Sequence, residues 1–383
     1  MIELRIIQKG KLPIKVWAGE VEEGAMQQAI NLSNLPFAFS HIALMPDVHQ
    51  GYGMPIGGIL ATVDNMIIPN AVGVDIGCGI TALKTDIAEI QTKEIEIILE
   101  KAKKLIPVGF NHNKKPQEWA GFNSAPNITI ISQELESARH QISSLGSGNH
   151  FCSIEHGSDG HIWLMVHSGS RNIGLKVANY YNNIAKRLNQ KNKMIPKEYD
   201  LAPLSLDTPE GNEYFQAMNY CMKFAKANRE LLAEKLFSAF SEVTGAKITR
   251  TIDCHHNYAG IEEHFGEEVI VHRKGAIQAK EGQIGIIPGS MGTPSYIVEG
   301  LGNPESFCSC SHGAGRVMSR KQANKVFTEE MANSAMQGIV FDGWRGDLSE
   351  APMAYKDIEM VIAIQDDLVK PLVKLNPLGV MKG

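Results

Sequence analysis

The sequence predicts one large α/β domain over residues 1–383, with a β-sheet core flanked by helices and a site built from loops at strand ends. Short, β-prone apolar runs broken by glycine alternate with long amphipathic segments along the chain. Glycine-rich loops occur in both halves, so no boundary separates two independent units. With 43% hydrophobic residues, the chain is long enough to bury a sizeable core.

Composition narrows the class of protein. The net charge of −5 means that any site for a polyanion must be a local basic patch. No apolar run approaches the roughly 18 residues that span a bilayer. Residues 1–5 also lack the plan of a signal peptide, so we expect a cytoplasmic protein. The six cysteines are scattered without a CxxC pair, which argues against a disulfide framework and a zinc ribbon.

The N-terminal region is predicted to form strands and one helix. Two short strands are expected within residues 1–18, and a helix at residues 25–32. Residues 37–62 predict a strand, a polar glycine loop and a second strand. Asp47 and His49 lie in this loop, and on an extended segment both would point to one side. The alternative is a turn stabilised by the aspartate.

In the run 71–80, two side chains can form hydrogen bonds or bind a metal, Asp75 and Cys78. The other residues are apolar or glycine. A carboxylate in such surroundings is costly to bury without a partner. A cation would resolve this, and a thiolate three residues away is a natural second ligand.

The rest of the chain is predicted to form long helices, with histidines at strand ends between them. The predicted helices cover residues 92–105, 132–145, 173–191, 213–243, 317–331 and 356–375, with a surface loop at 111–127 and a short tail at the end. Methionine and aromatic residues at helical spacing in 213–243 are expected to be core. Predicted strands at 161–166 and 247–252 lead to His167 and His256, and two glycines precede Asn149-His150.

Five candidate metal ligands thus stand on separate segments. They are Asp75, Cys78, His150, His167 and His256. A single histidine in such a place is more often a packed residue than a ligand, but this whole set is harder to explain by packing. Its oxygen, nitrogen and sulfur donors would suit zinc, iron, cobalt or manganese, and donor chemistry alone favours zinc.

His312 lies among small residues, with Gly313, Gly315 and Arg316 directly behind it. The helix predicted next has Ser319 as its N-cap. Glycines, a helix N-terminus and an arginine favour a phosphate, and His312 would then be a ligand, a base or a nucleophile. A glycine-rich turn with a packed histidine is the alternative.

Eight motifs resemble those of the RtcB RNA ligase family, in the family's order from about residue 15 to the end. They are Asp47-Val48-His49 with Gly51, Gly73 to Gly79, Gly148 to Phe151, His167 to Arg171, His255 to Tyr258, Arg273 to Ala276, Pro288 to Met291 and His312 to Arg316. The terminal Lys382-Gly383 also fits.

The resemblance implies a ligase dependent on GTP and Mn²⁺ that acts in tRNA splicing or RNA repair. It would join RNA ends bearing a 2′,3′-cyclic phosphate or 3′-phosphate to 5′-hydroxyl ends, with an archease-type activator as a possible partner. His312 would take GMP as a phosphoramidate, and the five candidate ligands would hold two Mn²⁺ ions with Cys78 bridging. Arg171 and Arg316 would contact RNA phosphate.

The resemblance also implies a set of nucleotide-binding residues. They are Asn149, His150, Phe151, Cys152, Ser153, His256, Asn257, Pro288, Gly289, Ser290, Met291, Ser295, His312, Gly313, Ala314, Gly315 and Lys382. Ser153 departs from the family, which usually has a glutamate there to pair with guanine, and Glu155 stands two places later. We therefore expect weakened selectivity for GTP over ATP.

Two other functions compete with ligation. A metal-dependent phosphoesterase would open cyclic phosphates without joining ends, and a non-catalytic RNA-binding or scaffolding protein would keep only the fold. The complete ligand set and His312 argue against a scaffold. A narrow phosphate track is expected at Arg171, Arg273, Lys274, Arg316 and Arg320.

Overall fold

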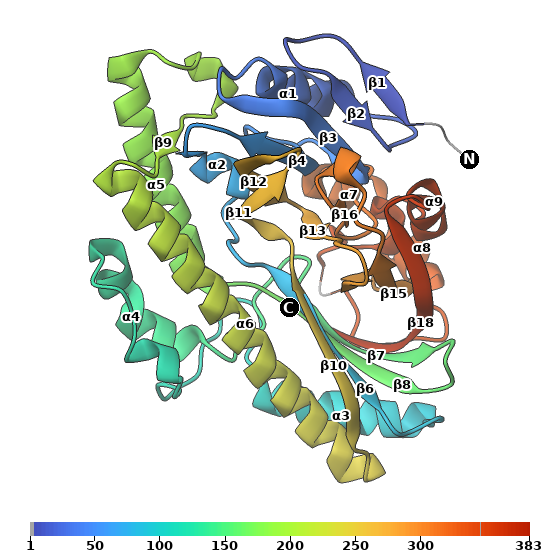
Figure 1. Cartoon of the computed structure of the whole chain (residues 1–383). Helices are drawn as coiled ribbons and strands as arrows, with labels where there is room; N and C mark the ends of the chain where they lie inside the picture. Colours follow the sequence, from blue (N-terminus) through green and yellow to red (C-terminus); the bar gives the residue numbers. More distant parts are fainter. Residues whose placement is uncertain (1–3, 345) are drawn as a thin grey trace.

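A computed structural model describes residues 4–344 and 346–383 as a mixed α/β fold, which confirms the predicted fold class (Figure 1). Residues 1–3, part of the first predicted strand region and of the segment compared with a signal peptide, lie outside the described residues. The strands form two large sheets and two small ones.

The first large sheet has six strands. In spatial order they are β1 (Arg5–Ile7), β2 (Ile14–Val16), β3 (Ala38–His49), β4 (Ile56–Thr62), β12 (Glu267–Lys274) and β11 (Asn257–His264). Helix α1 (Glu23–Ser33) packs against β3 through Ala25, Ala29 and Leu32. Strand β3 continues through Asp47 to His49, so these two residues lie on a strand rather than in the predicted loop.

The second large sheet has seven strands on one path and an eighth at its side. The path runs β10 (Ile248–His255), β6 (Gly79–Thr85), β8 (Ile162–Ser168), β7 (Phe151–Gly157), β18 (Val369–Lys382), β15 (Ser295–Gly300) and β14 (Ile284–Ile287), and β17 (Val340–Phe341) pairs with β18. The small sheets pair β13 (Ala276–Gln278) with β16 (Ser309–Ser311), and β5 (Met66–Ile67) with β9 (Leu204–Ser205). His256 alone separates β10 from β11, so the chain passes from one large sheet to the other at this residue.

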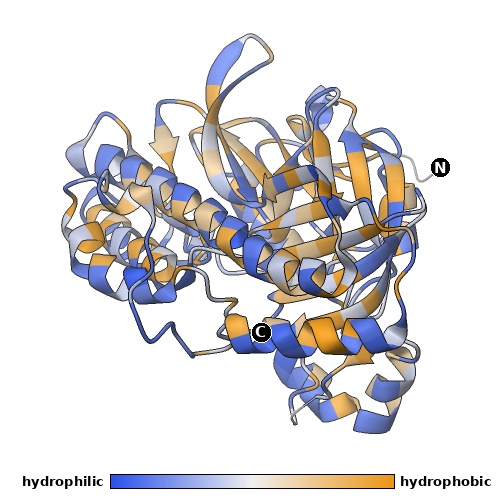
Figure 2. Cartoon of the chain, turned by 90° about the horizontal axis from the view of Figure 1, so that it is seen from below, coloured by the Kyte–Doolittle hydropathy of each residue, from blue (hydrophilic) through white to orange (hydrophobic). Residues whose placement is uncertain are grey.

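Helices cover the sheets from outside. They are α2 (Pro69–Val72), α3 (Thr92–Leu105), α4 (Thr129–Gln141), α5 (Arg171–Asn192), α6 (Pro209–Thr244), α7 (Arg320–Val326), α8 (Glu329–Ala335) and α9 (Ile358–Ile364), with 3₁₀ turns at Ala120–Phe122, Lys197–Tyr199, Pro304–Ser306 and Pro352–Ala354. Hydrophilic and hydrophobic residues alternate along the helices, as expected for elements with one buried face (Figure 2).

Helix α6 is the longest helix of the described chain and runs diagonally beside β10 and β6 (Figure 1). The Thr208 side chain caps its start by accepting a hydrogen bond from Gly211 N, and Gly245 ends it with a left-handed φ of 71°. Its apolar side chains, among them Phe224 and Leu236, lie in two core clusters, which confirms their predicted role.

Two predicted helices were wrong. The helix expected at 356–375 ends at Ile364, and residues 369–382 form the central strand β18, because this segment pairs with β7 and β15. The helix expected at 317–331 is divided into α7 and α8. Ser319 caps α7 as predicted, but Thr328 accepts a hydrogen bond from Met331 N and so begins a new helix.

Two simpler expectations can also be compared with the structure. Among the described residues, no helix combines the length and the apolar character needed to cross a membrane. All six cysteines are free.

Candidate functional site

A cavity opens where the ends of the two large sheets meet the β13–β16 pair. Most of the predicted nucleotide-binding residues line it: Asn149, His150, Phe151, Pro288, Gly289, Ser290, Met291, His312, Gly313, Ala314, Gly315 and Lys382. His49, Arg316, Arg320 and Glu350 complete much of its wall. Loops far apart in the sequence therefore converge on one space.

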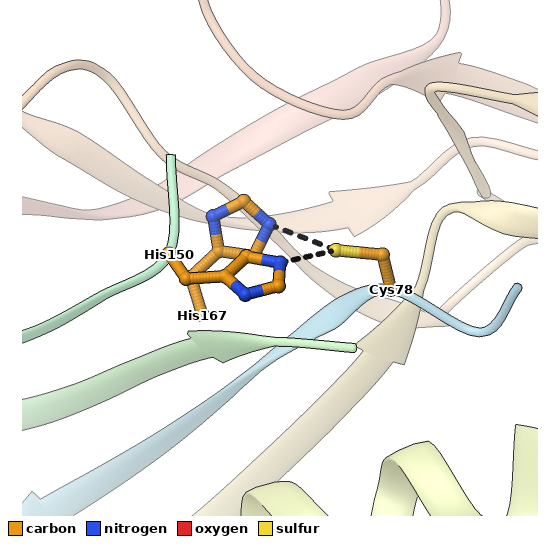
Figure 3. A group of neighbouring side chains, drawn as sticks. All are labelled: Cys78, His150 and His167. Carbon is orange, nitrogen blue, oxygen red and sulfur yellow. Dashed lines mark hydrogen bonds between the residues drawn. The ribbon is translucent and has the colours of Figure 1, made fainter. Parts of the chain in front are cut away.

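Three of the predicted ligands form a tight group beside this cavity (Figure 3). Cys78 Sγ lies 3.3 Å from His167 Nε2 and 3.5 Å from His150 Nε2. Asp75 Oδ2 lies 3.1 Å from His150 Nε2. Because β6, β8 and β7 are neighbouring strands, their ends bring these side chains to the same edge of the sheet.

The protonation of this group suits a metal ligand set only in part. His150 Nδ1 donates to the Leu145 carbonyl oxygen over 2.9 Å, which turns Nε2 toward Asp75 and Cys78. Burial holds the pKa of His167 well below its usual value, which keeps this imidazole neutral. Burial, with the nearby Asp75 carboxylate, raises the pKa of Cys78, so a metal would have to displace the thiol proton. This buried Cys/His group can hold a metal ion.

His256 connects the group to His312. Its ring centroid lies 5.2 Å from that of His167 and 4.8 Å from that of His312. Its backbone N donates to the Cys78 carbonyl oxygen over 2.9 Å. Its Nδ1 is buried and has no hydrogen-bond partner among the described residues. A buried nitrogen without a partner is consistent with a metal ligand. The five predicted ligands are thus neighbours, and their role as ligands stays a prediction.

The imidazole of His312, directly after β16, is fixed by Asp47. Asp47 Oδ2 lies 2.6 Å from His312 Nδ1 and also accepts from the His312 backbone N over 3.1 Å. A carboxylate accepts hydrogen bonds, so Nδ1 carries the proton and Nε2 keeps its lone pair. Gly315, with a φ of 74°, permits this approach, because a Cβ there would lie 2.2 Å from the Asp47 carbonyl oxygen.

Lys356 supports Asp47 from behind. Its Nζ donates to the carbonyl oxygens of Pro46 and Val48 over 3.0 and 2.7 Å. The sequence drew attention to Asp47 but assigned it no role in the site. Its alternation with His49 was the available signal, whereas its partner lies 265 residues away.

Some predicted nucleotide residues do not line the cavity. Cys152 points to the opposite face of β7 and packs in the core. The Asn257 side chain donates to the Asp75 carbonyl oxygen and accepts from Gly275 N, so it joins the metal-candidate loop to the loop beside His312. His256, Ser153 and Ser295 lie behind the cavity surface.

Ser153 is bound to Glu155. Ser153 Oγ donates to Glu155 Oε1 over 2.7 Å, and Glu155 Oε2 is buried without a partner in the described chain. Burial raises the pKa of Glu155 to about 7, although hydrogen bonds from Ser153 and Ser295 act in the opposite direction. The carboxylate that is absent at position 153 is therefore present two residues later, at Glu155, on the same face of β7.

The expected phosphate track is only partly at the surface. Arg316 and Arg320 line the cavity, where both are paired with Glu350. Arg171 donates to Ser144 Oγ and the Gly109 carbonyl oxygen. The expectation was wrong for Arg273 and Lys274. Both side chains are buried and have partners inside the protein. Arg273 pairs with Glu262, and Lys274 donates to the carbonyl oxygens of Tyr52 and Asn70.

Known proteins match the chain over nearly its whole length. A family model described as "tRNA-splicing ligase RtcB" matches residues 28–128 and 115–383. The RNA-splicing ligase RtcB of Escherichia coli K12 is 39% identical over 97% of each chain. The RNA-splicing ligase RtcB of Mycobacterium tuberculosis is 32% identical over 93% of this chain and 100% of its own. The tRNA-splicing ligase RtcB of Thermococcus kodakarensis is 29% identical over 94% and 92%.

Proposed function

The chain belongs to the RtcB family, and from this premise we propose that it is an RNA ligase of tRNA splicing or RNA repair. It would act through residues 1–383 as one domain and join 2′,3′-cyclic phosphate or 3′-phosphate ends to 5′-hydroxyl ends. The observation that carries this proposal is the His312 imidazole, held by Asp47 and one ring away from the Cys78 group.

His312 would be the nucleophile toward GTP. With the proton held at Nδ1 by Asp47, the Nε2 lone pair attacks the α-phosphorus. A bond from Nε2 to phosphorus forms as the bond to the leaving pyrophosphate breaks. No proton has to leave Nε2, which explains why a carboxylate partner at Nδ1 is useful.

The guanylate then activates the RNA end. Water first opens a cyclic phosphate to a 3′-phosphate, and an oxygen of this phosphate attacks the guanylate phosphorus and releases His312. The 5′-hydroxyl oxygen attacks the RNA phosphorus, its proton is lost, and GMP leaves as the new phosphodiester forms. Arg316 and Lys382, which line the cavity, would hold phosphate oxygens. Arg171, which lies close to Gly146 beside His150, would contact RNA phosphate.

Asp75, Cys78, His150, His167 and His256 would hold two Mn²⁺ ions. The lowered pKa values of His167 and His256 and the His256 Nδ1, which has no hydrogen-bond partner among the described residues, support this assignment. When bound, the ions would offset the negative charge of the triphosphate and of the reacting phosphates. Donor chemistry alone favours zinc, so the choice of Mn²⁺ follows from the family.

Selectivity for guanine is proposed to be weaker than in relatives with glutamate at position 153. The Ser153 hydroxyl hydrogen points to Glu155, so Ser153 offers a base an oxygen lone pair but no pair of carboxylate acceptors. Equal rates of His312 labelling by labelled GTP and ATP would support this proposal. Labelling by GTP alone would refute it.

The central test combines the protein with GTP, Mn²⁺ and an RNA pair that carries 3′-phosphate and 5′-hydroxyl ends, with and without an archease-type activator. We expect joined RNA and a GMP adduct on His312 by mass spectrometry. His312→Ala should lower both by at least about 1,000-fold. A second RNA that ends in a 2′,3′-cyclic phosphate tests the alternative: opening of this phosphate without any adduct would instead identify a phosphoesterase, and absence of all reactions would favour a scaffold.

A further inference from the structure

Arg229 lies in the middle of α6, a helix that the sequence assigns to the core, and its side chain is 0% exposed. Taking a guanidinium out of water costs several kcal/mol unless its donors are paired. A buried arginine in an otherwise apolar stretch therefore needs a specific set of acceptors.

Polar groups surround the Arg229 guanidinium, which carries five N–H groups. Nε and Nη2 donate to Asp253 Oδ1 and Oδ2 over 2.8 and 2.9 Å. Nη1 donates to the carbonyl oxygens of Gly77 and Ser168 over 2.9 and 3.2 Å. Nη2 also lies 3.2 Å from His255 Nδ1.

Three of these acceptors are chain neighbours of predicted metal ligands. Gly77 precedes Cys78, Ser168 follows His167, and His255 precedes His256. One planar side chain thus reaches three ligand-bearing segments that come from distant parts of the sequence.

The preceding residue of α6 strengthens this arrangement. Asn228 Nδ2 donates to Ser168 Oγ and to the Gly169 carbonyl oxygen over 3.0 and 3.1 Å. Asn228 Oδ1 accepts from Ser144 N over 3.2 Å. Gly169 in turn approaches Asp75 so closely that a Cβ would lie 2.1 Å from Asp75 Oδ1.

We propose that Arg229 is a positioning residue, which holds the Cys78, His167 and His256 segments so that their donor atoms face one point. It touches neither substrate nor metal, and the proposal builds on the metal site proposed above. Groups that orient first ligands commonly change metal affinity by about 10–100-fold when they are removed.

Arg229→Lys is the sharpest variant. Lysine keeps the positive charge, but its three donors share one nitrogen. One nitrogen cannot lie close to Asp253 and to two carbonyl oxygens on separate segments at the same time, as the planar guanidinium does. Arg273→Lys is the matched control. Arg273 is also 0% exposed and pairs with a carboxylate, Glu262, but none of its acceptors adjoins a predicted ligand.

The experiment titrates the full-length protein with Co²⁺ and records its absorption spectrum, in which a thiolate ligand gives a charge-transfer band. We expect Arg229→Lys to weaken Co²⁺ binding by about 10–100-fold and to alter this band, with circular dichroism unchanged. Arg273→Lys should lose comparable thermal stability but keep the affinity and spectrum of the unaltered protein. If Arg229→Lys behaves like Arg273→Lys, the inference is overturned.

Asp253→Asn decides the question if Arg229→Lys does not fold. This substitution removes the carboxylate charge that pairs with the guanidinium but keeps Arg229. Co²⁺ affinity should therefore fall by about tenfold. An unchanged affinity would overturn the inference. Failure of the unaltered protein to bind Co²⁺ or Mn²⁺ would instead refute the metal site itself, so the two failures are distinguishable.

Discussion

Two walls of the cavity hold their imidazoles by different means. The ligand wall, where His150 and His167 line the cavity with Asp75 and Cys78 beside them, is held by the Leu145 carbonyl oxygen on His150 and by the Arg229 side chain on the neighbouring backbone. The imidazole wall, formed by Asp47 and residues 312–315, depends on one carboxylate that binds both the ring and the backbone of His312. In the described chain, the groups that support one wall support no residue of the other. The two walls should therefore respond separately to single substitutions.

Asp47→Asn should have the largest effect. An asparagine keeps the shape, but it no longer favours the tautomer with a proton at His312 Nδ1, and guanylylation should fall by about 1,000–10,000-fold. The measurement is the rate of transfer of labelled GMP to the protein. Co²⁺ affinity should stay unchanged, and a parallel loss of affinity would show that the walls act as one unit. Asp64→Asn, on an exposed loop, is the control.

Cys78→Ser should have a smaller effect and act first on metal affinity. A hydroxyl is far less acidic than a thiol, so the site loses an anionic ligand and metal affinity should fall by about 100-fold. Calorimetric titration with Mn²⁺ measures the loss. Cys308→Ser, outside the site, should bind as before. Unchanged binding by Cys78→Ser would exclude the thiol from the ligand set.

Glu155→Gln concerns β7, behind the cavity surface, and should change stability rather than either wall. The pKa of Glu155 is raised from 4.5 to about 7, so between these values the folded chain keeps a proton that the unfolded chain has released. The stability contributed by the protonated form is complete below pH 4.5 and is lost as the pH rises through 7.

Glutamine does not ionise, so Glu155→Gln should gain stability relative to the unaltered protein as the pH rises from 4.5 to 8, by up to about 3 kcal/mol. Urea unfolding at both pH values measures the difference. Equal differences at the two pH values would mean that folding does not raise the pKa of Glu155.

The sequence predicted the candidate metal ligands better than the residues that hold the site in place. Asp75, Cys78 and the three histidines stand out because glycine-rich or apolar residues surround them. Asp47 received no role because its partner lies far away in the sequence. Arg229 was missed because an arginine in an amphipathic helix resembles a surface residue until its acceptors are known.

The fold class followed from the alternation of elements, but the C-terminal region did not. Residues 369–382 were assigned partly to a helix and partly to a tail. Their strand conformation depends on β7 and β15, which no local pattern reveals. Helix 92–105, in contrast, was predicted with its observed bounds, because its period and its following proline are local signals.

The place of β18 between β7 and β15 has a consequence for synthesis on the ribosome. Cys78, His150 and His167 leave the exit tunnel long before residues 369–382, so the sheet that carries them stays incomplete during most of translation. Contacts between such distant segments also form slowly. A nascent chain would therefore expose thiol and imidazole groups to metal ions and oxidants until its last strand is inserted, and assistance from chaperones should matter most at this late stage.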